Sequence, residues 1–197
     1  MSSFKKAKRV LDNHGVIAFP TETVMGFGVF YDDKLAYEKL NLIKQRKPNK
    51  PYTVMVANKE VIKKFAEVDT KAEKLIDAFM PGSITLLLRA KADVPSWAKS
   101  QDGIVGIRIP SNNLALKLLF YLEKPLLVPS ANRADERPCK NHKQVKKLFD
   151  KEIDYIIKGK AISDIPSTII DLSGKDVKII REGPISFEEI KTVIKEN

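Results

Sequence analysis

The chain has 197 residues, a length that predicts one domain, and we expect residues 1–197 to form it. A single cysteine excludes an internal disulfide framework, and two histidines leave too few ligands for a typical zinc site, so we expect no metal held mainly by the protein. The 35 Lys and Arg outnumber the 25 Asp and Glu, and the net charge of +10 indicates an anionic partner such as a nucleotide, a nucleic acid or an acidic surface.

The N-terminal residues, MSSFKKAKRVLDNHG, lack the apolar stretch of a secretion signal. No apolar run approaches the ~20 residues that cross a bilayer. We therefore expect a cytoplasmic protein with no membrane partner. Residues 3–13 have helical spacing with Ser2 or Ser3 as the cap, and Gly15 is predicted to end this helix in the left-handed conformation.

Strands and helices then alternate along the chain. Strands are predicted at 16–19, 27–31, 52–56, 84–89, 104–109, 126–128, 155–157, 168–172 and 177–181. Helices are predicted at 33–45, 59–67, 71–79, 112–121, 143–149 and 187–195. The interleaving predicts an α/β fold, and the short connections indicate a mixed sheet.

The first polar segment of interest follows a predicted strand and contains Thr21, Glu22 and Thr23 before Gly26 and Gly28. Ligands of open α/β sheets bind at strand ends, and glycines permit close approach of a ligand to the backbone. The alternative is an ordinary turn. The segment is not a P-loop, because the Gly-Lys-Ser/Thr ending is absent.

A basic segment closes the next predicted helix and runs from Lys44 through Arg46 and Lys47 to Lys50. Cations at a helix C-terminus offset its dipole, which explains the segment without a ligand. Arginine and lysine together are also the residues of a phosphate clamp. Both interpretations stay open at this point.

Two arginines interrupt or end otherwise apolar strands. Arg108 lies in Val105-Gly-Ile-Arg-Ile109, and Arg181 ends the strand before Glu182. A charge in such a strand lies either on a solvated edge or in a polar cleft, and two cases near strand ends favour a cleft. Two further polar pairs follow predicted strands or turns and could serve a turn or a ligand: Ser130 with Asn132, and Ser167 with Thr168.

Taken in order, these segments resemble the threonylcarbamoyl-AMP synthase family, also called the Sua5/YciO/YrdC family. The resemblance covers about residues 15–185, and the early end of the chain makes it similar to the short, single-domain bacterial type. It rests on Phe19-Pro-Thr-Glu-Thr-Val-x-Gly-x-Gly28, Lys44-x-Arg46 with Lys50-Pro51, Pro81-Gly-Ser-Ile-Thr85, Gly106-Ile-Arg-Ile-Pro110, Ser130-Ala-Asn132, Ser167-Thr-Ile-Ile-Asp171 and Arg181-Glu-Gly183.

The resemblance implies a twisted α/β sheet with flanking helices around a deep basic cleft. It also implies that ATP, L-threonine and bicarbonate or CO2 give threonylcarbamoyl-AMP and pyrophosphate. The product would pass to a threonylcarbamoyl transferase complex that modifies adenosine 37 of tRNA, so that any contact with tRNA is indirect. Mg²⁺ is expected with ATP, held mainly by the triphosphate.

The resemblance further assigns residues. The implied catalytic set is Lys44, Arg46, Ser130 and Asn132. The implied threonine-binding set is Thr21 and Thr23. The implied ATP-binding set is Lys44, Arg46, Thr85, Arg108, Ser130, Asn132, Ser167 and Arg181.

The chain departs from the family pattern at two places of interest. Met25 stands where tyrosine is usual, which predicts a missing aromatic contact near the threonine pocket. Ala134-Asp135 stands where Ser-Gly is usual. Neither departure touches the Lys-x-Arg or Ser-x-Asn pair.

Two other functions remain open from the sequence. An RNA-binding or ribosome-associated module could use the same basic cleft, supported by the net charge and by a lysine run at 140–151. Against it, no aromatic and basic residues interleave as in stacking surfaces, and a solvated helix face explains the run. Transfer of a carbamoyl group to a hydrogenase-maturation thiol is the third option, which the short chain disfavours.

Overall fold

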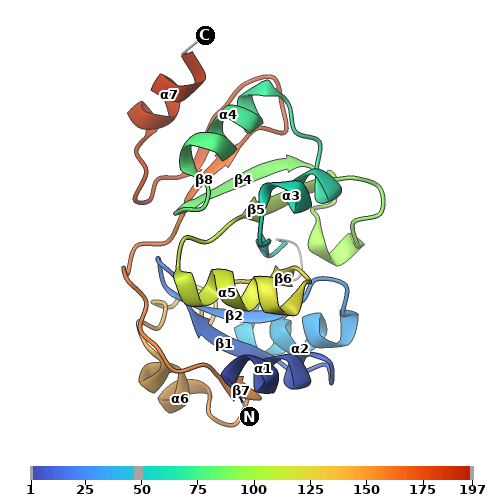
Figure 1. Cartoon of the computed structure of the whole chain (residues 1–197), viewed down its shortest axis with the longest axis vertical. Helices are drawn as coiled ribbons and strands as arrows, with labels where there is room; N and C mark the ends of the chain where they lie inside the picture. The colour runs from blue at the N-terminus through green and yellow to red at the C-terminus, as the bar shows by residue number, and fades with distance from the viewer. Residues whose placement is uncertain (1, 47–50, 196–197) are drawn as a thin grey trace.

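The computed structural model describes residues 2–46 and 51–195. Its strands form one mixed sheet in the order β7-β1-β2-β6-β3-β5-β4-β8-β9, flanked by helices (Figure 1). This confirms the predicted mixed α/β fold. The strands are β1 (Ile17–Pro20), β2 (Met25–Phe30), β3 (Val54–Met55), β4 (Ile84–Arg89), β5 (Ile104–Arg108), β6 (Leu126–Leu127), β7 (Tyr155–Ile156), β8 (Thr168–Asp171) and β9 (Lys178–Arg181).

Three strand pairs are parallel, namely β1 with β7, β3 with β5, and β4 with β8. The other neighbours are antiparallel, and β1 and β2 form a hairpin whose turn holds the Thr-Glu-Thr segment. Strand β5 lies inside the sheet between β3 and β4, with Ile107 opposite Val54 and Leu86. Arg108, the last residue of β5, is therefore fixed by strands on both sides.

The helices pack into two apolar clusters. One cluster joins α1 (Ser3–Leu11) and α5 (Asn113–Leu122) to the inner residues of β1 and β6. The larger cluster contains residues of α2 (Lys34–Lys44), α3 (Lys59–Phe65), α4 (Thr70–Phe79), α6 (His142–Phe149) and α7 (Phe187–Lys195). No helix in the described ranges is long and apolar enough to cross a membrane.

Side-chain caps begin the helices where the sequence places them. Ser2 accepts the Lys5 N–H at the start of α1, and Asp33 accepts the Ala36 N–H at the start of α2. A short 3₁₀ helix at Ser96–Ala98 was not predicted.

The prediction for the end of α1 is wrong. His14, not Gly15, is the left-handed residue, with φ 58°. Gly15 is required for a different reason: a Cβ there would lie 2.5 Å from Val10 Cγ1, because the chain doubles back against the helix. The glycine therefore permits a close approach and supplies no special φ.

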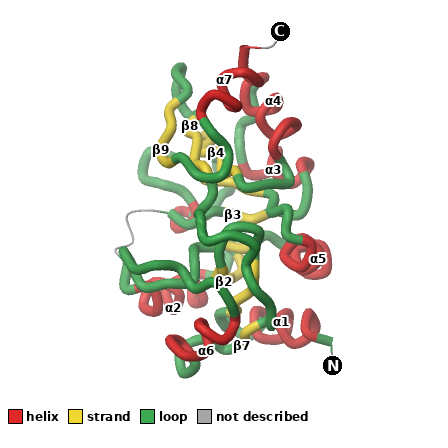
Figure 2. The backbone as a smooth tube through the Cα atoms, turned by 90° about the vertical axis from the view of Figure 1, so that its left-hand side faces the viewer, coloured by secondary structure: helices red, strands yellow, loops and turns green. Residues whose placement is uncertain are grey.

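Figure 2 shows the same chain from the side, with α6, β7 and α1 grouped at the N-terminal end of the molecule and α7 at the other. The edge of the sheet formed by β4, β8 and β9 lies toward α4 and α7. The strands β2, β3 and β6 lie between these two ends. The predicted site residues come from strands, from the end of α2 and from the loops that join these elements.

Candidate active site

A cleft of about 200 Å³ opens where these loops meet. Seven of the ten residues predicted for the site line it: Thr21, Thr23, Arg46, Arg108, Ser130, Ser167 and Arg181. The other three, Lys44, Thr85 and Asn132, are buried and hydrogen bonded to lining residues or to each other. The structure therefore brings the whole predicted set together.

Lys44 is the last residue of α2, and its ammonium group is buried behind the cleft wall. Its Nζ donates to the Ser130 carbonyl oxygen and to Asn132 Oδ1, both at 2.7 Å. Burial, together with the smaller effect of the nearby positive charge of Arg46, lowers the pKa of Lys44 to about 7. Lys44 can therefore gain or lose a proton near neutral pH, according to the charge of what enters the cleft.

The turn after β6 is built around the side chain of Asn132. Ser130 Oγ donates to Asn132 Oδ1 at 2.6 Å, so this oxygen accepts bonds from both Ser130 and Lys44. The Asn132 amide nitrogen donates to the Arg133 and Glu136 carbonyl oxygens, both at 2.7 Å. These four bonds fix the amide orientation, so Asn132 holds Lys44 in place while Ser130 faces the cleft.

Arg46 lies at the cleft mouth over the ring of Tyr52, with 5.2 Å between the guanidinium carbon and the ring centroid. Tyr52 donates its hydroxyl proton to Asn41 Oδ1 at 2.7 Å, and burial raises the pKa of Tyr52. Sequence reasoning missed Tyr52, although an aromatic residue close to a predicted phosphate clamp is a usable signal. Of the Lys50-Pro51 motif, Pro51 lines the cleft and Lys50 lies outside the described residues.

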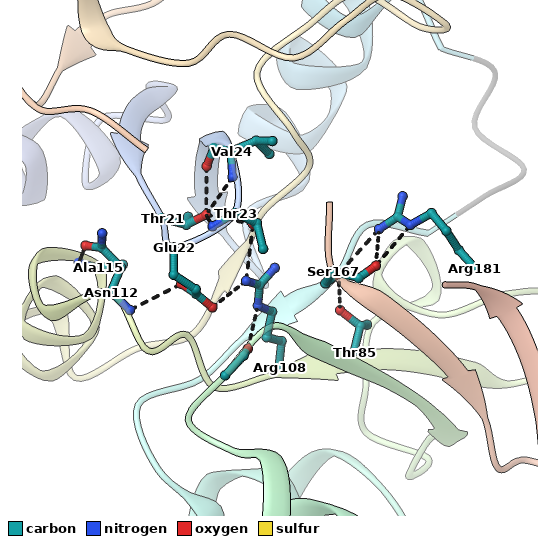
Figure 3. Close-up of polar contacts among 11 residues, drawn as sticks. Thr21, Glu22, Thr23, Val24, Thr85, Arg108, Asn112, Ala115, Ser167 and Arg181 are labelled. Carbon is teal, nitrogen blue, oxygen red and sulfur yellow. Dashed lines mark hydrogen bonds and ion pairs between the residues drawn. The ribbon is translucent and has the colours of Figure 1, made fainter. Parts of the chain in front are cut away.

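Arg108 crosses the floor of the cleft and is held by three neighbours (Figure 3). Its Nε donates to the Gly82 carbonyl oxygen at 3.1 Å, and its Nη2 donates to Thr23 Oγ1 at 3.2 Å and to Glu22 Oε1. Glu22 is the second residue that the assignment of roles missed. Its signal was its place between two threonines at a strand end.

The opposite wall carries Ser167 and Arg181. Thr85 and Ser167 share a hydroxyl hydrogen bond of 3.0 Å, and Arg181 donates through Nε and Nη2 to the Ser167 carbonyl oxygen at 3.0 and 2.8 Å. Burial lowers the pKa of Arg181, with a smaller effect from the positive charge of Arg108. The Arg181 guanidinium is thus oriented by neutral oxygens, and its positive charge is not compensated by them.

These contacts leave the cleft suited to an anion. Arg46 and Arg181 contact a ring and neutral oxygens, whereas Arg108 is paired with Glu22. Neutral ligands orient a cation without cancelling its charge, so a phosphate or carboxylate entering the cleft meets uncompensated positive charge. Across the described ranges, no cluster of three or more His, Cys, Asp and Glu side chains could hold a metal ion.

The expectation for Met25 is wrong. Its side chain is fully buried in the larger apolar cluster with Phe27 and Val29, on the face of β2 that packs against α2, and it does not line the cleft. The alternation of β2 places Gly26 on the cleft side instead. Methionine at this position therefore removes no group from the cleft.

The Ala134-Asp135 departure places a residue other than glycine in the left-handed region of backbone conformation. Asp135 adopts φ 63°, a region that favours glycine, so the glycine usual at this position has a conformational reason. Asp135 is one of the residue types that tolerate this region.

The lysine run lies elsewhere. Lys143, Lys146 and Lys147 are exposed on α6, whose Val145 and Phe149 face the core. None of these lysines lines the cleft. They form the solvated face of an amphipathic helix, which is the alternative to RNA binding that the sequence predicted for the run.

The fold and the cleft place the chain among α/β proteins with a cleft lined by arginine, serine and threonine side chains beside a mixed sheet. The family model described as "Telomere recombination", which covers Sua5, YciO and YrdC, matches residues 9–183. The chain belongs to the Sua5/YciO/YrdC family.

Individual relatives agree with this. The threonylcarbamoyl-AMP synthase of Pyrococcus abyssi is 33% identical over 92% of this chain, which spans about half (54%) of that relative's length. The threonylcarbamoyl-AMP synthase of Nitrosococcus oceani is 31% identical over 78% of this chain and 83% of its own length.

Solved structures extend the likeness. The crystal structure of P. abyssi Sua5 complexed with L-threonine superposes with a TM-score of 0.92 at 32% identity, over 98% of this chain and 57% of that one. Escherichia coli YciO superposes with a TM-score of 0.88 at 27% identity, over 95% and 92%. The likeness to YciO therefore extends over nearly the full length of both chains.

Proposed function

We propose that this protein is an enzyme of the threonylcarbamoyl-AMP synthase type, which converts L-threonine, bicarbonate or CO2, and ATP to threonylcarbamoyl-AMP and pyrophosphate. One observation carries the proposal: Lys44, Ser130 and Asn132 form one hydrogen-bonded cluster at a cleft lined by Arg46, Arg108 and Arg181. The names of the relatives and the threonine complex of P. abyssi Sua5 support it.

The reaction needs charge stabilisation and alignment more than a covalent nucleophile. The threonine amine attacks CO2 and loses a proton to give a carbamate. A carbamate oxygen then attacks the α-phosphorus of ATP, and the bond to the bridging oxygen of the β-phosphate breaks as pyrophosphate leaves. Cationic side chains held in fixed positions stabilise the charge that develops on the phosphoryl oxygens.

The cleft offers each part of the substrates a place. We assign the Thr21–Thr23 hairpin turn to threonine and assign Arg181, Ser167 and Thr85 to the nucleotide. We assign Lys44 and Arg46 to the place where the carbamate meets the α-phosphate. A proton gained by Lys44 as the anions bind would strengthen that interaction, because its pKa of about 7 rises when negative charge approaches.

Mg²⁺ belongs to this proposal as a partner of ATP. The described side chains present no three-ligand cluster for it, which fits an ion held by the triphosphate oxygens. When bound, it would neutralise phosphate charge and favour departure of pyrophosphate.

The biological setting is also proposed. As a nucleotidyltransferase of the cytoplasm, the enzyme would hand threonylcarbamoyl-AMP to a threonylcarbamoyl transferase complex. That complex would modify adenosine 37 of tRNA, and tRNA itself would have no need to enter this cleft. The adenylate is a reactive mixed anhydride, so rapid transfer to the consuming enzyme limits its hydrolysis.

One assay tests the proposal. Purified protein is incubated with ATP, Mg²⁺, L-threonine and bicarbonate, pyrophosphate is measured by a coupled assay, and the adenylate is identified by mass spectrometry. We expect pyrophosphate release only when threonine and bicarbonate are both present. Release that does not depend on threonine would indicate another acceptor, and the absence of release in the complete mixture would refute the proposal.

A further inference from the structure

Glu22 occupies a buried position beneath the cleft, with its side chain only 6% exposed. Its Oε1 accepts from Arg108 Nη2, and its Oε2 accepts from the backbone N–H of Asn112 at 3.2 Å, just before α5 begins (Figure 3). Each oxygen of the carboxylate therefore has its own donor. A side chain that accepts at only one atom cannot replace both bonds.

The hydrogen bonds that start at Arg108 run in one direction. Thr21 has a single hydroxyl proton, which it donates to the Val24 carbonyl oxygen at 2.7 Å. Thr23 Oγ1 lies 2.9 Å from Thr21 Oγ1, so Thr23 must be the donor in that bond. Thr23 in turn accepts from Arg108 Nη2 at 3.2 Å. The chain therefore runs from Arg108 to Thr23, then to Thr21, and ends at Val24.

This direction decides what Thr23 can offer a ligand. The hydroxyl proton of Thr23 is already used, and only a lone pair on its oxygen remains for a group in the cleft. A lone pair repels phosphate and carboxylate oxygens and attracts an N–H or O–H group. Threonine carries both kinds of donor, on its amine and on its hydroxyl group.

Glu22 holds Arg108, and Arg108 in turn fixes the position of Thr23 Oγ1. The positive charges of Arg108 and Arg181 repel each other across the cleft, and this repulsion adds to burial, the larger cause, in lowering the pKa of Arg181. The carboxylate of Glu22 counteracts this repulsion and keeps Nη2 aimed at Thr23. Without it, Arg108 would be free to turn toward an anionic ligand and leave Thr23.

We propose that Glu22 is a positioning residue that, through Arg108, holds the Thr23 oxygen in place as a hydrogen-bond acceptor for a donor group of the amino-acid substrate. The inference rests on the proposed function, because it takes that substrate to be an amino acid. It assigns Glu22 a role that differs from binding: Glu22 contacts Arg108 and Asn112, and acts on the substrate only through Thr23.

Four variants test it in the pyrophosphate assay, with KM measured separately for threonine and for ATP. Glu22→Gln keeps the size of the side chain but can accept at only one of the two positions. Thr23→Val keeps the shape of threonine and removes the acceptor, and it leaves the Glu22–Arg108 pair intact if the first variant folds poorly. The double variant tests whether the two act together, and Thr23→Ser is the matched control that keeps the hydroxyl.

We expect Glu22→Gln and Thr23→Val each to raise the threonine KM about 10-fold or more, with the ATP KM within about twofold of wild type, because one charge-assisted contact is lost. We expect the double variant to resemble the worse single variant, since both changes disrupt one chain of bonds. Thr23→Ser keeps the acceptor oxygen and should recover most of the threonine affinity that Thr23→Val loses.

Three results would overturn the inference: an unchanged threonine KM in folded Thr23→Val, equal changes in the threonine and ATP KM values, or effects that multiply in the double variant. Failure of the proposed function is distinct, because it appears in the wild-type protein as pyrophosphate release without threonine dependence. That result would also remove the amino-acid ligand assumed here.

Discussion

The cations of the cleft and the exposed lysines of α6 show how the surroundings change the effect of the same kind of charge. Lys44 and Arg181 are held by carbonyl, amide and hydroxyl oxygens, which orient them but leave their charge uncompensated. Lys146 extends into solvent from the polar face of α6, where water screens its charge. The net charge of +10 therefore divides into a small buried part with a chemical use and a larger solvated part.

The difference has an energetic side. A buried cation loses hydration, and the hydrogen bonds that replace it only partly compensate for that loss. The fold accepts this cost at Lys44, whose pKa falls to about 7. Elsewhere the structure pairs partly buried cations with carboxylates, as at Arg133, which makes a two-pronged ion pair with Glu152. Unpaired buried cations therefore mark the part of the molecule that is built for an anion.

The largest expected effect contrasts Lys44 with Lys146. Lys44→Met should lower the rate of threonine-dependent pyrophosphate release by about 100-fold or more, because a charge that stabilises the transition state is lost. Lys146→Met makes the same chemical change on the solvated face and should leave the rate within about twofold. Steady-state assays on both variants measure the contrast, and a similar rate for the two would remove Lys44 from the catalytic set.

The second prediction concerns stability and pH. Unfolded lysine has a pKa near 10.4, whereas Lys44 in the fold has a pKa of about 7, so between these values the unfolded chain binds more protons. The free energy of unfolding of wild type relative to Lys44→Met should therefore rise with pH from about 7 to 10, by at most ~1.4 kcal/mol per pH unit.

Urea unfolding at several pH values measures this difference. The wild type compared with Lys146→Met serves as the control and should show no such slope, because an exposed lysine titrates at a similar pH in the folded and unfolded chains. If the difference in free energy of unfolding between wild type and Lys44→Met does not change with pH, Lys44 stays fully charged in the folded protein.

The smallest effect is expected on α6. Replacing Lys143, Lys146 and Lys147 together by Gln should change the free energy of unfolding by no more than about 0.5 kcal/mol per site and leave the pyrophosphate assay unchanged. A large loss of activity in this triple variant would show that the solvated face takes part in the reaction, and would revive the interpretation in which the lysine run binds a partner.

Much of the fold follows from local sequence. The apolar runs and caps predict nearly every helix and strand, because burial periodicity and capping act over a few residues. The end of α1 was misjudged, since the need for glycine at position 15 comes from its contact with Val10, which only the path of the chain reveals. The sheet order could not be derived from the sequence, because it depends on pairings between distant segments.

The sequence predicted which residues belong to the site but not how these residues contact one another. The resemblance to the family assigned the ten site residues, whereas the role of Glu22 depends on its contact with Arg108 of another strand. Met25 was placed in the cleft by family likeness, although the alternation of β2 puts it with Phe27 and Val29 in the core. The alternation of residues along the strand could have predicted the direction of the Met25 side chain from the sequence. It is a better guide to that direction than the resemblance to the family.

The strand order has a consequence for how the protein forms. Strand β7 pairs with β1, joining residues 155–156 to 17–18, while β8 lies near the opposite edge of the sheet. The segment between β7 and β8 crosses the sheet, donates the Ile162 N–H to the Thr21 carbonyl oxygen and delivers Ser167 to the cleft. Pairings between such distant residues close large loops, which slows folding. We therefore expect the two walls of the cleft to come together slowly during folding.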